Sequence, residues 1–281
     1  MRRFVDLHTH STASDGDLPP AEVIRLAERE GLAAIALTDH DTTAGLAEAS
    51  RAAEAFVDLH FVPGIEISAR PPSGTLHILG LGIDEASPAI QGVAAFLRNA
   101  RTERTPRILD RLHSLGAAVE MPEVLREAGG EVVSRVHIAR ALVAKGHVGD
   151  LREAFGRYLA KGAPAYVERD RPAPGEAIAA VVEAGGVAAL AHPVQLECET
   201  PERLEQIVRD LKAAGLGAIE AYHSDQTPEY TRVCIDLARE VGLGVTGGSD
   251  FHGRAKAAVR MGRPRVALTA LGDELAGGLL R

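Results

Sequence analysis

The feature that most constrains this chain's fold is a repeated alternation of short apolar runs with helical patterns. The apolar runs have strand length and occur at residues 4–8, 33–37, 59–67, 76–83, 187–191, 216–221, 243–246 and 266–269. Helical patterns separate most of them, at residues 20–30, 44–55, 175–184, 201–214 and 228–241. This β-α order predicts an α/β fold with a mainly parallel sheet.

The alternation stops between residues 88 and 171. That segment has helical patterns, few strand signals and closely spaced arginines, namely Arg98, Arg101, Arg104, Arg107 and Arg111. We therefore expect a mainly helical subdomain at 88–171, inserted between two barrel segments at 1–87 and 172–281. A chain of 281 residues is long enough for one α/β barrel with such an insertion.

Charge and composition exclude several classes of protein. A net charge of −8 argues against a long nucleic-acid duplex as the main ligand, but it leaves room for a small phosphorylated ligand held by a few local arginines. The chain has no apolar run long enough for a membrane span and no signal-peptide pattern, so we expect a cytoplasmic protein. The two cysteines, Cys198 and Cys234, are too far apart in sequence to suggest a thiolate metal cluster.

Histidines and carboxylates recur where the predicted strands end. In a barrel, the carboxyl ends of the strands form the rim at which active sites are built. The first half of the chain contributes His8, His10, Asp15, His40, Glu66 and His77, and the second half contributes His192, Asp250 and His252.

Each of these positions alone has an ordinary explanation. The His8-x-His10 pair can arise by chance on a strand, the turn that contains His40 can be a polar helix start, and His77 can be a hydrogen-bonded core histidine. Their joint placement at strand ends favours a shared metal site. Nine ligands are too many for one ion, and nitrogen and oxygen donors without sulfur suit Mn²⁺, Fe²⁺ or Zn²⁺. Such a set is typical of two-metal hydrolysis.

In this order the motifs resemble those of the polymerase-and-histidinol-phosphatase (PHP) family. They are His8-x-His10, Ser14-Asp15-Gly16, Thr38-Asp39-His40, Gly64-Ile65-Glu66, His77, Ala191-His192-Pro193 and Gly248-Ser249-Asp250-x-His252. The resemblance implies a distorted seven-stranded β/α barrel with a trinuclear metal centre.

The resemblance also implies how the ligands divide among three ions. One ion would take His8, His10, Glu66 and Asp250; a second would take Glu66, His77 and His192, with Glu66 bridging; a third would take Asp15, His40 and His252. Many relatives have a histidine where Asp15 stands, so this sequence departs from the family pattern at the third ion.

The inserted segment narrows the resemblance to one branch of the family. Its motifs are Arg101-Thr102-Glu103-Arg104, Ser134-Arg135-Val136-His137-Ile138-Ala139-Arg140 and Tyr158-Leu159-Ala160-Lys161-Gly162. Members of the similar branch remove the 3′-phosphate from nucleoside 3′,5′-bisphosphates, and others trim short RNA from its 5′ end. The expected partner is thus a small phosphorylated nucleotide or a short RNA.

Arginine chemistry supports a ligand with a second phosphate. Arg101 and Arg104 are three residues apart on a predicted helix, and a guanidinium makes a planar two-pronged contact with phosphate oxygens. Without the resemblance, a solvated helix face explains this pair as well. Arg135 and His137 can equally form an ion pair near a helix start, and Lys161 can be a surface lysine.

Hydrolysis of a ribose phosphate needs a proton or a metal contact for the leaving oxygen. His223 and His137 are both candidates for the proton, and the sequence does not choose between them. We assign Arg101, Arg104, Ser134, Arg135, His137, Lys161 and His223 to substrate binding. Asp39 and Glu220 are candidates for orienting the metal-binding histidines.

Two other functions remain open at this point. Histidinol-phosphate phosphatase is a second enzymatic interpretation, against which the arginine-rich insertion counts. A non-catalytic regulatory module with a degenerate metal site is an interpretation of a different class, against which the full ligand set counts. Mn²⁺ is the expected metal, with Zn²⁺ or Fe²⁺ as alternatives.

Overall fold

Eight strands form where the apolar runs predict them. The computed structural model describes residues 3–128 and 133–279, so residues 1–2 and 280–281 of the predicted barrel segments lie outside it. The strands are β1 (Phe4–Asp6), β2 (Ala34–Leu37), β3 (His60–Ala69), β4 (Leu76–Leu81), β5 (Val187–Leu190), β6 (Ala218–Tyr222), β7 (Gly244–Gly247) and β8 (Val266–Ala267).

The helices of the two barrel segments also agree with their predicted ranges to within two residues at each end. They are α1 (Pro20–Arg29), α2 (Leu46–Ala53), α7 (Pro174–Glu183), α8 (Pro201–Ala213) and α9 (Pro228–Val241). Four of them begin with a proline in the first turn, where its fixed φ suits a helix and its missing N–H costs nothing. A further helix, α10 (Gly272–Leu279), was not predicted.

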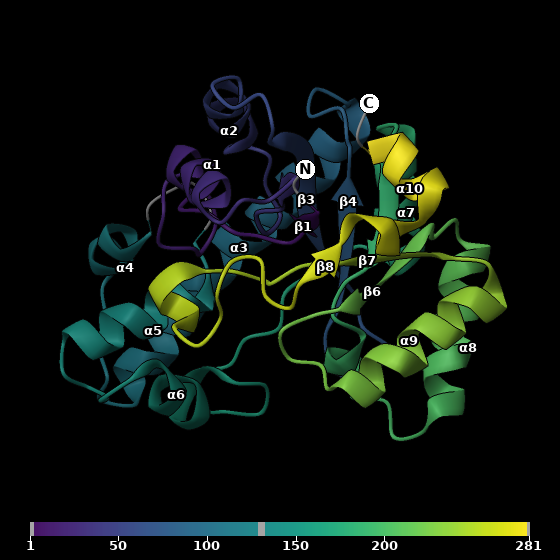
Figure 1. Ribbon diagram of the computed structural model, residues 1–281. Coiled ribbons are helices and arrows are strands. Elements are labelled where there is room, and N and C mark those ends of the chain that lie inside the picture. The colour runs from purple at the N-terminus through teal and green to yellow at the C-terminus, as the bar shows by residue number, and fades with distance from the viewer. Residues whose placement is uncertain (1–2, 129–132, 280–281) are drawn as a thin grey trace.

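The strands form one sheet in the order β7-β6-β5-β4-β3-β2-β1-β8, curved into a barrel (Figure 1). The sheet contains the seven strands of the expected barrel, β1 to β7, and one more, because the two-residue β8 pairs antiparallel with β1. Beyond their ends, β1 and β7 close the ring. The backbone N–H of Leu7 donates to the Gly247 carbonyl at 3.1 Å, and that of Asp250 donates to the His8 carbonyl at 2.9 Å.

This closure requires a glycine at position 248. A Cβ at Gly248 would lie 2.3 Å from the Cβ of His8, well inside any allowed contact. The sequence motif around Gly248 thus reflects a close approach of two backbones. Its consequence is that the segments after β1 and β7, which carry His8 and Asp250, lie side by side.

Strand β4 runs antiparallel to both of its neighbours, β3 and β5. It follows β3 without an intervening helix, so it returns along β3 as a hairpin partner. The start of β4 therefore lies at the same rim as the carboxyl ends of the parallel strands. His77, the second residue of β4, reaches that rim for this reason.

The two faces of β2 carry residues of different size. In β2, Ala34 and Ala36 belong to the interior cluster, whereas Ile35 and Leu37 pack in the larger cluster that includes the surrounding helices. Side chains alternate across a strand, so small residues fill the narrow interior and large ones contact the helices. All four residues are fully buried.

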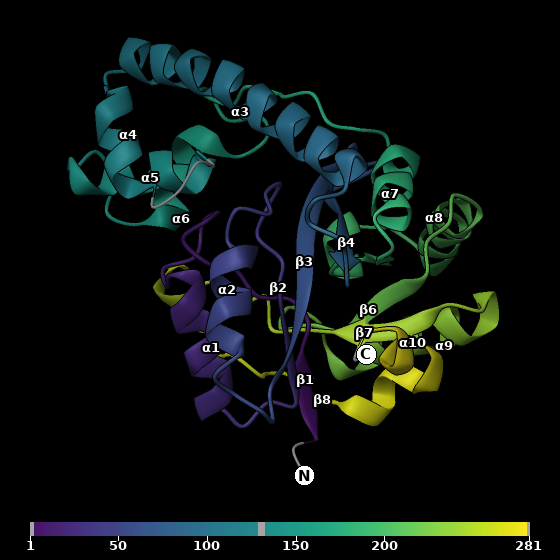
Figure 2. The same cartoon turned by 90° about the horizontal axis from the view of Figure 1, so that it is seen from above.

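The segment between β4 and α7 is helical, as its pattern predicts. It contains α3 (Pro88–Ser114), α4 (Met121–Glu127), α5 (Arg135–Ala144), α6 (Leu151–Ala154) and one π-helical turn (Phe155–Leu159). Ile90 and Leu97 of α3 pack in the barrel cluster, whereas Ile108 and Leu112 pack in a separate cluster with α4 and α5. Figure 2 shows α3 crossing above the barrel with α4, α5 and α6 at its far end.

The remaining short elements are 3₁₀ turns at Pro193–Leu196, Gly253–Lys256 and Leu268–Leu271. None of the helices in the described part of the chain combines the length and the apolar character that a membrane span needs.

Candidate functional site

The residues predicted to bind metal lie together at the carboxyl-terminal rim of the barrel. They come from the segments after β1, β2, β5 and β7, from β3 itself and from the start of β4: His8, His10, Asp15, His40, Glu66, His77, His192, Asp250 and His252. Glu66 lies within β3 rather than at its end, because that strand continues to Ala69 beside β4.

Four side chains form the first donor group. His8 Nε2 lies 3.1 Å from Glu66 Oε2 and 3.5 Å from Asp250 Oδ1, and His10 Nε2 lies 3.2 Å from each of these two oxygens. Ligand atoms that share one ion at about 2.1 Å are roughly 3–3.5 Å apart, so this group has the spacing of a single divalent site. All four residues are buried.

The two oxygens of Glu66 face different histidines. Oε1 lies 2.6 Å from His77 Nδ1 and 2.8 Å from His192 Nε2, whereas Oε2 faces the first donor group and lies 3.0 Å from His40 Nδ1. Burial would raise the pKa of Glu66, but the nearby histidines His40, His77 and His8 hold it well below its usual value. An ionised carboxylate with one oxygen toward each set is arranged to bridge two cations.

A third group surrounds Asp15. His252 Nε2 lies 3.3 Å from Asp15 Oδ1, and donor atoms of His10, His40, Asp15 and His252 all lie within 4.8 Å of one another. His10 also stacks on His252, with ring centroids 4.0 Å apart. The structure therefore places His10 beside this group as well as in the first, a proximity that the sequence did not indicate.

Unpartnered buried atoms test whether a cation fits here. His8 Nε2, His10 Nε2, His40 Nδ1, Glu66 Oε2 and Asp15 Oδ1 are buried, and none forms a hydrogen bond to another described residue. Buried polar atoms normally find partners, and leaving them without one is costly. Histidine nitrogens and carboxylate oxygens without sulfur form a donor set suited to Mn²⁺, Fe²⁺ or Zn²⁺. The residues present thus fit divalent cations.

Other buried carboxylates position these donors. Glu220 accepts a hydrogen bond from His8 Nδ1 at 3.0 Å and one from the backbone N–H of His192 at 2.7 Å, as expected of a residue that orients a metal-binding histidine. Asp39 acts differently from its prediction. It accepts from Ser11 and Ser14 and so fixes the loop that carries Asp15.

Backbone strain is concentrated at this rim. Asp41, His192 and Asp250 have φ values of 60°, 27° and 57°, in the left-handed region that non-glycine residues seldom adopt. Such conformations persist where the surroundings enforce them, and they cluster at functional sites.

Asp41 organises the arginines, a role that the sequence did not reveal. Its carboxylate accepts from Arg101 Nε at 3.0 Å, from Arg169 Nη2 at 3.1 Å and from the Ser68 backbone N–H at 2.8 Å. Burial opposes its ionisation, but the guanidinium groups of Arg101 and Arg169 hold the pKa of Asp41 far below its usual value. Arg101 is thus buried and paired rather than solvated.

Arg104 lies beside this pair, buried and without a carboxylate partner among the described residues. Burial, together with the nearby guanidinium groups of Arg101, Arg169, Arg135 and Arg171, lowers its pKa to about 8. Its Nε atom is buried and has no hydrogen-bond partner. The cluster is therefore short of negative charge, so a bound anion would stabilise it.

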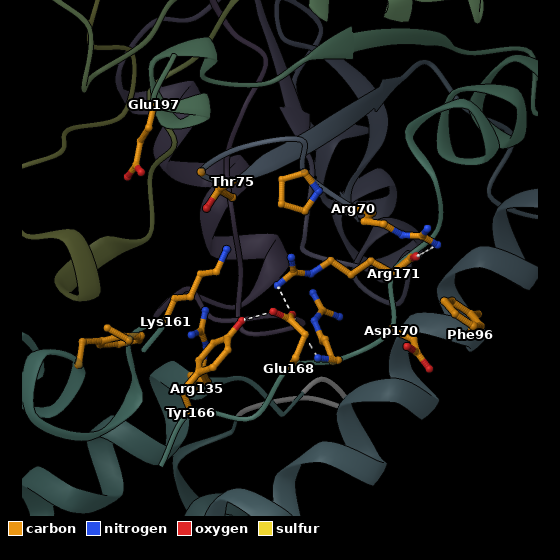
Figure 3. A pocket seen from close by; sticks show the side chains of 15 residues that line it. Arg70, Thr75, Phe96, Arg135, Lys161, Tyr166, Glu168, Asp170, Arg171 and Glu197 are labelled. Atoms are coloured by element: carbon orange, nitrogen blue, oxygen red, sulfur yellow. Dashed lines mark hydrogen bonds and ion pairs between the residues drawn. The ribbon is translucent and has the colours of Figure 1, made fainter. Parts of the chain in front are cut away.

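These arginines line a cavity of about 160 Å³ that metal-site residues line as well. Its lining includes Asp15, His40 and His77 together with Arg101, Arg104, Ser134, Arg135, Arg169 and Arg171. It shares Arg135, Arg169 and Arg171 with an outer cavity of about 740 Å³, drawn in Figure 3. The nine metal-binding side chains together form what we call the donor cluster. Members of this cluster and the arginines thus line two cavities that share lining residues.

The lining of the outer cavity includes cations and aromatic rings together with the carboxylates of Glu168, Asp170 and Glu197. The Arg135 guanidinium lies over the rings of Phe155 and Tyr166, at 5.7 Å and 5.3 Å from their centroids. In Figure 3, Lys161 and Arg135 point into the same space, and Tyr166 donates to Glu168 at 2.6 Å. The exposed Lys161 thus lies at the outer end of the arginine-lined space.

Ser134 and His137 form the start of α5. Ser134 is the N-cap residue, and its backbone N–H donates to His137 Nδ1 at 3.2 Å in a capping box. Burial lowers the pKa of His137 to about 4, so the ring is neutral near pH 7. A neutral ring whose Nδ1 is an acceptor carries its proton on Nε2, which makes His137 a hydrogen-bond donor rather than a strong acid.

His223 lies beside the donor cluster. Its Nε2 lies 3.4 Å from Asp250 Oδ2, and its Nδ1 accepts from the Asp225 backbone N–H at 3.1 Å. In the neutral ring the proton is therefore on Nε2, the nitrogen that faces the cluster. His223 lies beside His8 and His192, whereas His40 and His77 occupy the other side of the cluster.

Sequence analysis missed Asp41, Arg169 and Arg171 as members of this site. A signal for the two arginines was present, because alternate cations follow Tyr166 in the run Glu168-Arg169-Asp170-Arg171. Nothing local distinguishes Asp41 from a capping residue, since its partners lie 60 and 128 residues away in sequence.

Comparison with known proteins agrees with this geometry. The PHP domain model matches residues 6–128. A 3′,5′-nucleoside bisphosphate phosphatase from Chromobacterium violaceum is 39% identical over 88% of this chain and 87% of its own length. A 5′-3′ exoribonuclease from Haemophilus influenzae is 36% identical over 90% of this chain and 91% of its own length.

A solved structure extends the match to three dimensions. A Bifidobacterium adolescentis protein described as a metal-dependent phosphoesterase superposes with a TM-score of 0.86, at 32% identity, over 98% of this chain and 95% of that one. Identity above 30% along most of both chains, the shared fold and the donor cluster lead to one conclusion. This chain belongs to the PHP family of metal-dependent phosphoesterases.

Proposed function

We propose that this enzyme removes the 3′-phosphate of nucleoside 3′,5′-bisphosphates, and that the same site cleaves the first linkage of short 5′-phosphorylated RNA. One observation carries the proposal. A single cavity is lined both by metal-binding side chains and by buried arginines that are short of negative charge. A substrate with two phosphates satisfies both sets of side chains, with one phosphate at each.

The named relatives support the same substrate class. The Chromobacterium violaceum protein is a nucleoside bisphosphate phosphatase and the Haemophilus influenzae protein is an exoribonuclease. A nucleoside 3′,5′-bisphosphate carries a 5′-phosphate and a phosphate on the 3′ oxygen, and the first nucleotide of 5′-phosphorylated RNA carries the same pair. Histidinol phosphate carries one phosphate and an ammonium group, which the uncompensated arginines would repel.

The three donor groups would hold divalent cations, and Mn²⁺ is the cation we propose. His8, His10, Glu66 and Asp250 would hold the first, Glu66, His77 and His192 the second, and Asp15, His40 and His252 the third, with His10 beside it. Such cations supply Lewis acidity toward phosphoryl oxygens and lower the pKa of water.

The arginines position the other end of the substrate. Arg104 and Arg135 line the cavity without ion pairs to described carboxylates, and they would bind the 5′-phosphate. Asp41 keeps Arg101 and Arg169 oriented through the hydrogen bonds described above. Ser134 and neutral His137 would add neutral hydrogen bonds at the start of α5, and Lys161 would act at the cavity's outer end.

His223 is the residue we propose for the leaving group. Its Nε2 carries the proton and faces the cluster, as its hydrogen bond from Asp225 dictates. The bond between phosphorus and the ribose O3′ breaks, water supplies the new oxygen on phosphorus and the proton that O3′ takes, and the His223 Nε2–H donates a hydrogen bond that stabilises the charge developing on O3′. His137 is the weaker candidate, since none of the donor groups among the described residues includes it.

Phosphate release by the Mn²⁺-loaded enzyme tests the proposal. The substrates are adenosine 3′,5′-bisphosphate, 3′-AMP, 5′-AMP and histidinol phosphate. We expect the bisphosphate to have the highest kcat/KM, and Arg104→Ala to lower it while sparing 3′-AMP. Equal rates on the bisphosphate and histidinol phosphate would contradict the proposal.

An aryl phosphate tests the role of His223. Its leaving group is a stable anion that needs little stabilisation, so His223→Ala should lower kcat on the bisphosphate by roughly 10²-fold and much less on p-nitrophenyl phosphate. Equal losses on both substrates would remove His223 from this role.

A further inference from the structure

A cavity of about 410 Å³ borders the donor cluster at His223, a residue that does not line the arginine-lined space. Its lining consists of His223, Ser224, Gln226, Ala258, Val259, Arg260, Arg263 and Pro264. His223 forms its inner wall and lies 3.4 Å from Asp250 of the first donor group. The arginine-lined space borders His40 and His77 instead. The donor cluster thus borders two cavities that differ in their lining residues.

Two features suit this second cavity to an anion. Arg260 and Arg263 are exposed, and neither forms an ion pair with a described carboxylate, although the chain as a whole carries a net charge of −8. No carboxylate is found among the described residues of its lining. Arginine recognises phosphate oxygens through its planar fork of donors.

Two buried polar atoms complete the site. Ser224 Oγ and Gln226 Oε1 are buried and have no hydrogen-bond partner in the described part of the chain. Gln226 is fixed in place, because its Nε2 donates to the Ala221 carbonyl at 2.6 Å and its backbone N–H donates to the His223 carbonyl at 3.1 Å. The turn that fixes His223 therefore also offers unsatisfied oxygens, which match the hydroxyl donors of a ribose.

We propose that this cavity binds the nucleotide attached to the far side of the scissile phosphate in an oligoribonucleotide. The inference rests on the proposed function, because it takes the scissile phosphate at the donor cluster and the 5′-phosphate at the inserted arginines. A bisphosphate ends at the scissile phosphate and leaves the cavity unused. In RNA, that phosphate continues through its O5′ oxygen into a second nucleoside, which enters past His223.

The chemistry at phosphorus is the same for both substrates. Water adds its oxygen to phosphorus, the bond to O3′ of the first nucleoside breaks, and O3′ takes the proton. The second nucleoside keeps its phosphate as a new 5′-phosphate. Ser224 and Gln226 contact its ribose, and Arg260 and Arg263 bind the phosphate on its 3′ oxygen.

Three substrates of increasing length isolate this last contact. They are the bisphosphate pAp, the dinucleotide pApA and the same dinucleotide with a 3′-phosphate, pApAp. We expect Arg260→Ala and Arg263→Ala each to lower kcat/KM on pApAp roughly tenfold, and to change it less than twofold on pApA and pAp. Unchanged rates on pAp also show that the variants fold.

Salt dependence supplies a second measurement. Loss of one phosphate contact should lower the slope of log kcat/KM against log salt concentration by roughly 0.7, on pApAp alone. Arg239→Ala is the matched control, since it removes one positive charge from an exposed position on α9 that pairs only with Asp236 among the described carboxylates. It should leave all three substrates unaffected.

The outcomes separate this inference from the proposed function. Equal losses on pAp and pApAp, or no loss on pApAp, would overturn the second subsite. Wild-type enzyme that hydrolyses pAp but not pApAp would overturn it too, together with the proposed RNA cleavage, and would leave the proposed bisphosphatase activity intact. Wild-type enzyme that fails on pAp yet cleaves pApAp, with the expected arginine dependence, would contradict the bisphosphatase activity and support the subsite.

Discussion

Replacing Asp41 with asparagine tests the charge balance that holds the inserted helices against the metal site. The Asp41 carboxylate is fully buried and accepts hydrogen bonds from Arg101 of α3, from Arg169 and from Ser68 of β3. Asparagine has the same size and tolerates the φ of 60° at this position. The substitution therefore removes one charge and leaves the backbone unstrained relative to the wild type.

The expected loss of folding stability comes from the guanidinium groups that stay buried in the variant. Arg101 is 7% exposed and the Arg169 side chain is 5% exposed, so two buried guanidinium groups lose the carboxylate that pairs with them, next to the buried Arg104, which has no carboxylate partner among the described residues. Removing one partner of a buried ion pair costs about 3–5 kcal/mol, because the other charge stays buried. For a chain of this size, this corresponds to a decrease in Tm of roughly 6–20 °C.

Thermal and urea unfolding of the chelator-treated proteins, with and without inorganic phosphate, measure this effect. Phosphate should stabilise the Asp41→Asn variant more than the wild type, because an anion in the cavity replaces the missing charge. The control is Asp236→Asn, which removes an exposed carboxylate that pairs with Arg239 on α9 and should change stability by less than about 0.5 kcal/mol.

Two results would refute the reasoning. One is an Asp41→Asn variant whose free energy of unfolding lies within about 1 kcal/mol of the wild type, the low end of the cost of an unpaired buried group. The other is a phosphate response that does not differ between the two proteins. Either would mean that the arginines are neutralised by something other than Asp41.

Three further substitutions test the donor cluster and α5. Glu66→Gln should lower the amount of bound metal per chain at least tenfold, because the two oxygens of Glu66 face different donor groups. Elemental analysis after dialysis measures this, and full retention of metal would exclude a bridging role. Glu220→Gln should weaken metal affinity by about 10- to 100-fold, and saturating Mn²⁺ should restore most of kcat. A loss of kcat that no Mn²⁺ concentration restores would contradict a positioning role. His137 has a pKa of about 4 when folded and about 6.5 when unfolded, so the unfolded state binds more protons between these values and stability falls by about 3 kcal/mol as pH drops from 6.5 to 4. His137→Gln keeps a side-chain acceptor for the capping box and should remove this pH-dependent decrease in the free energy of unfolding, measured in urea on the metal-free protein. The control His113→Gln, at an exposed position, should not remove it. Identical pH profiles for both variants would be evidence against a buried neutral His137.

Local patterns alone determined the elements of the barrel. Proline in the first turn marks the start of α1, α7, α8 and α9, and Thr200 and Thr227 cap two of these helices. Apolar runs of strand length located all eight strands. These signals act over a few residues, so they can be read without knowing how the chain folds back on itself.

The sequence also indicated where the donors would gather, because parallel strands bring their carboxyl ends to one rim. That rule does not account for His77, which lies at the start of a strand. It joins the cluster only because β4 is antiparallel to β3 and β5, a result of the hairpin pairing. The position of His10 between two donor groups likewise depends on how the segment after β1 packs against the segment after β7.

The arginine-lined cavity was decided by tertiary structure alone. Asp41 could be read from the sequence only as a turn residue, yet it pairs with arginines 60 and 128 positions later in the chain. α3 makes this pairing possible, because its first half packs on the barrel and its second half on the inserted helices. A buried charge selects its partner by desolvation and distance in the folded chain, and no local periodicity encodes either quantity.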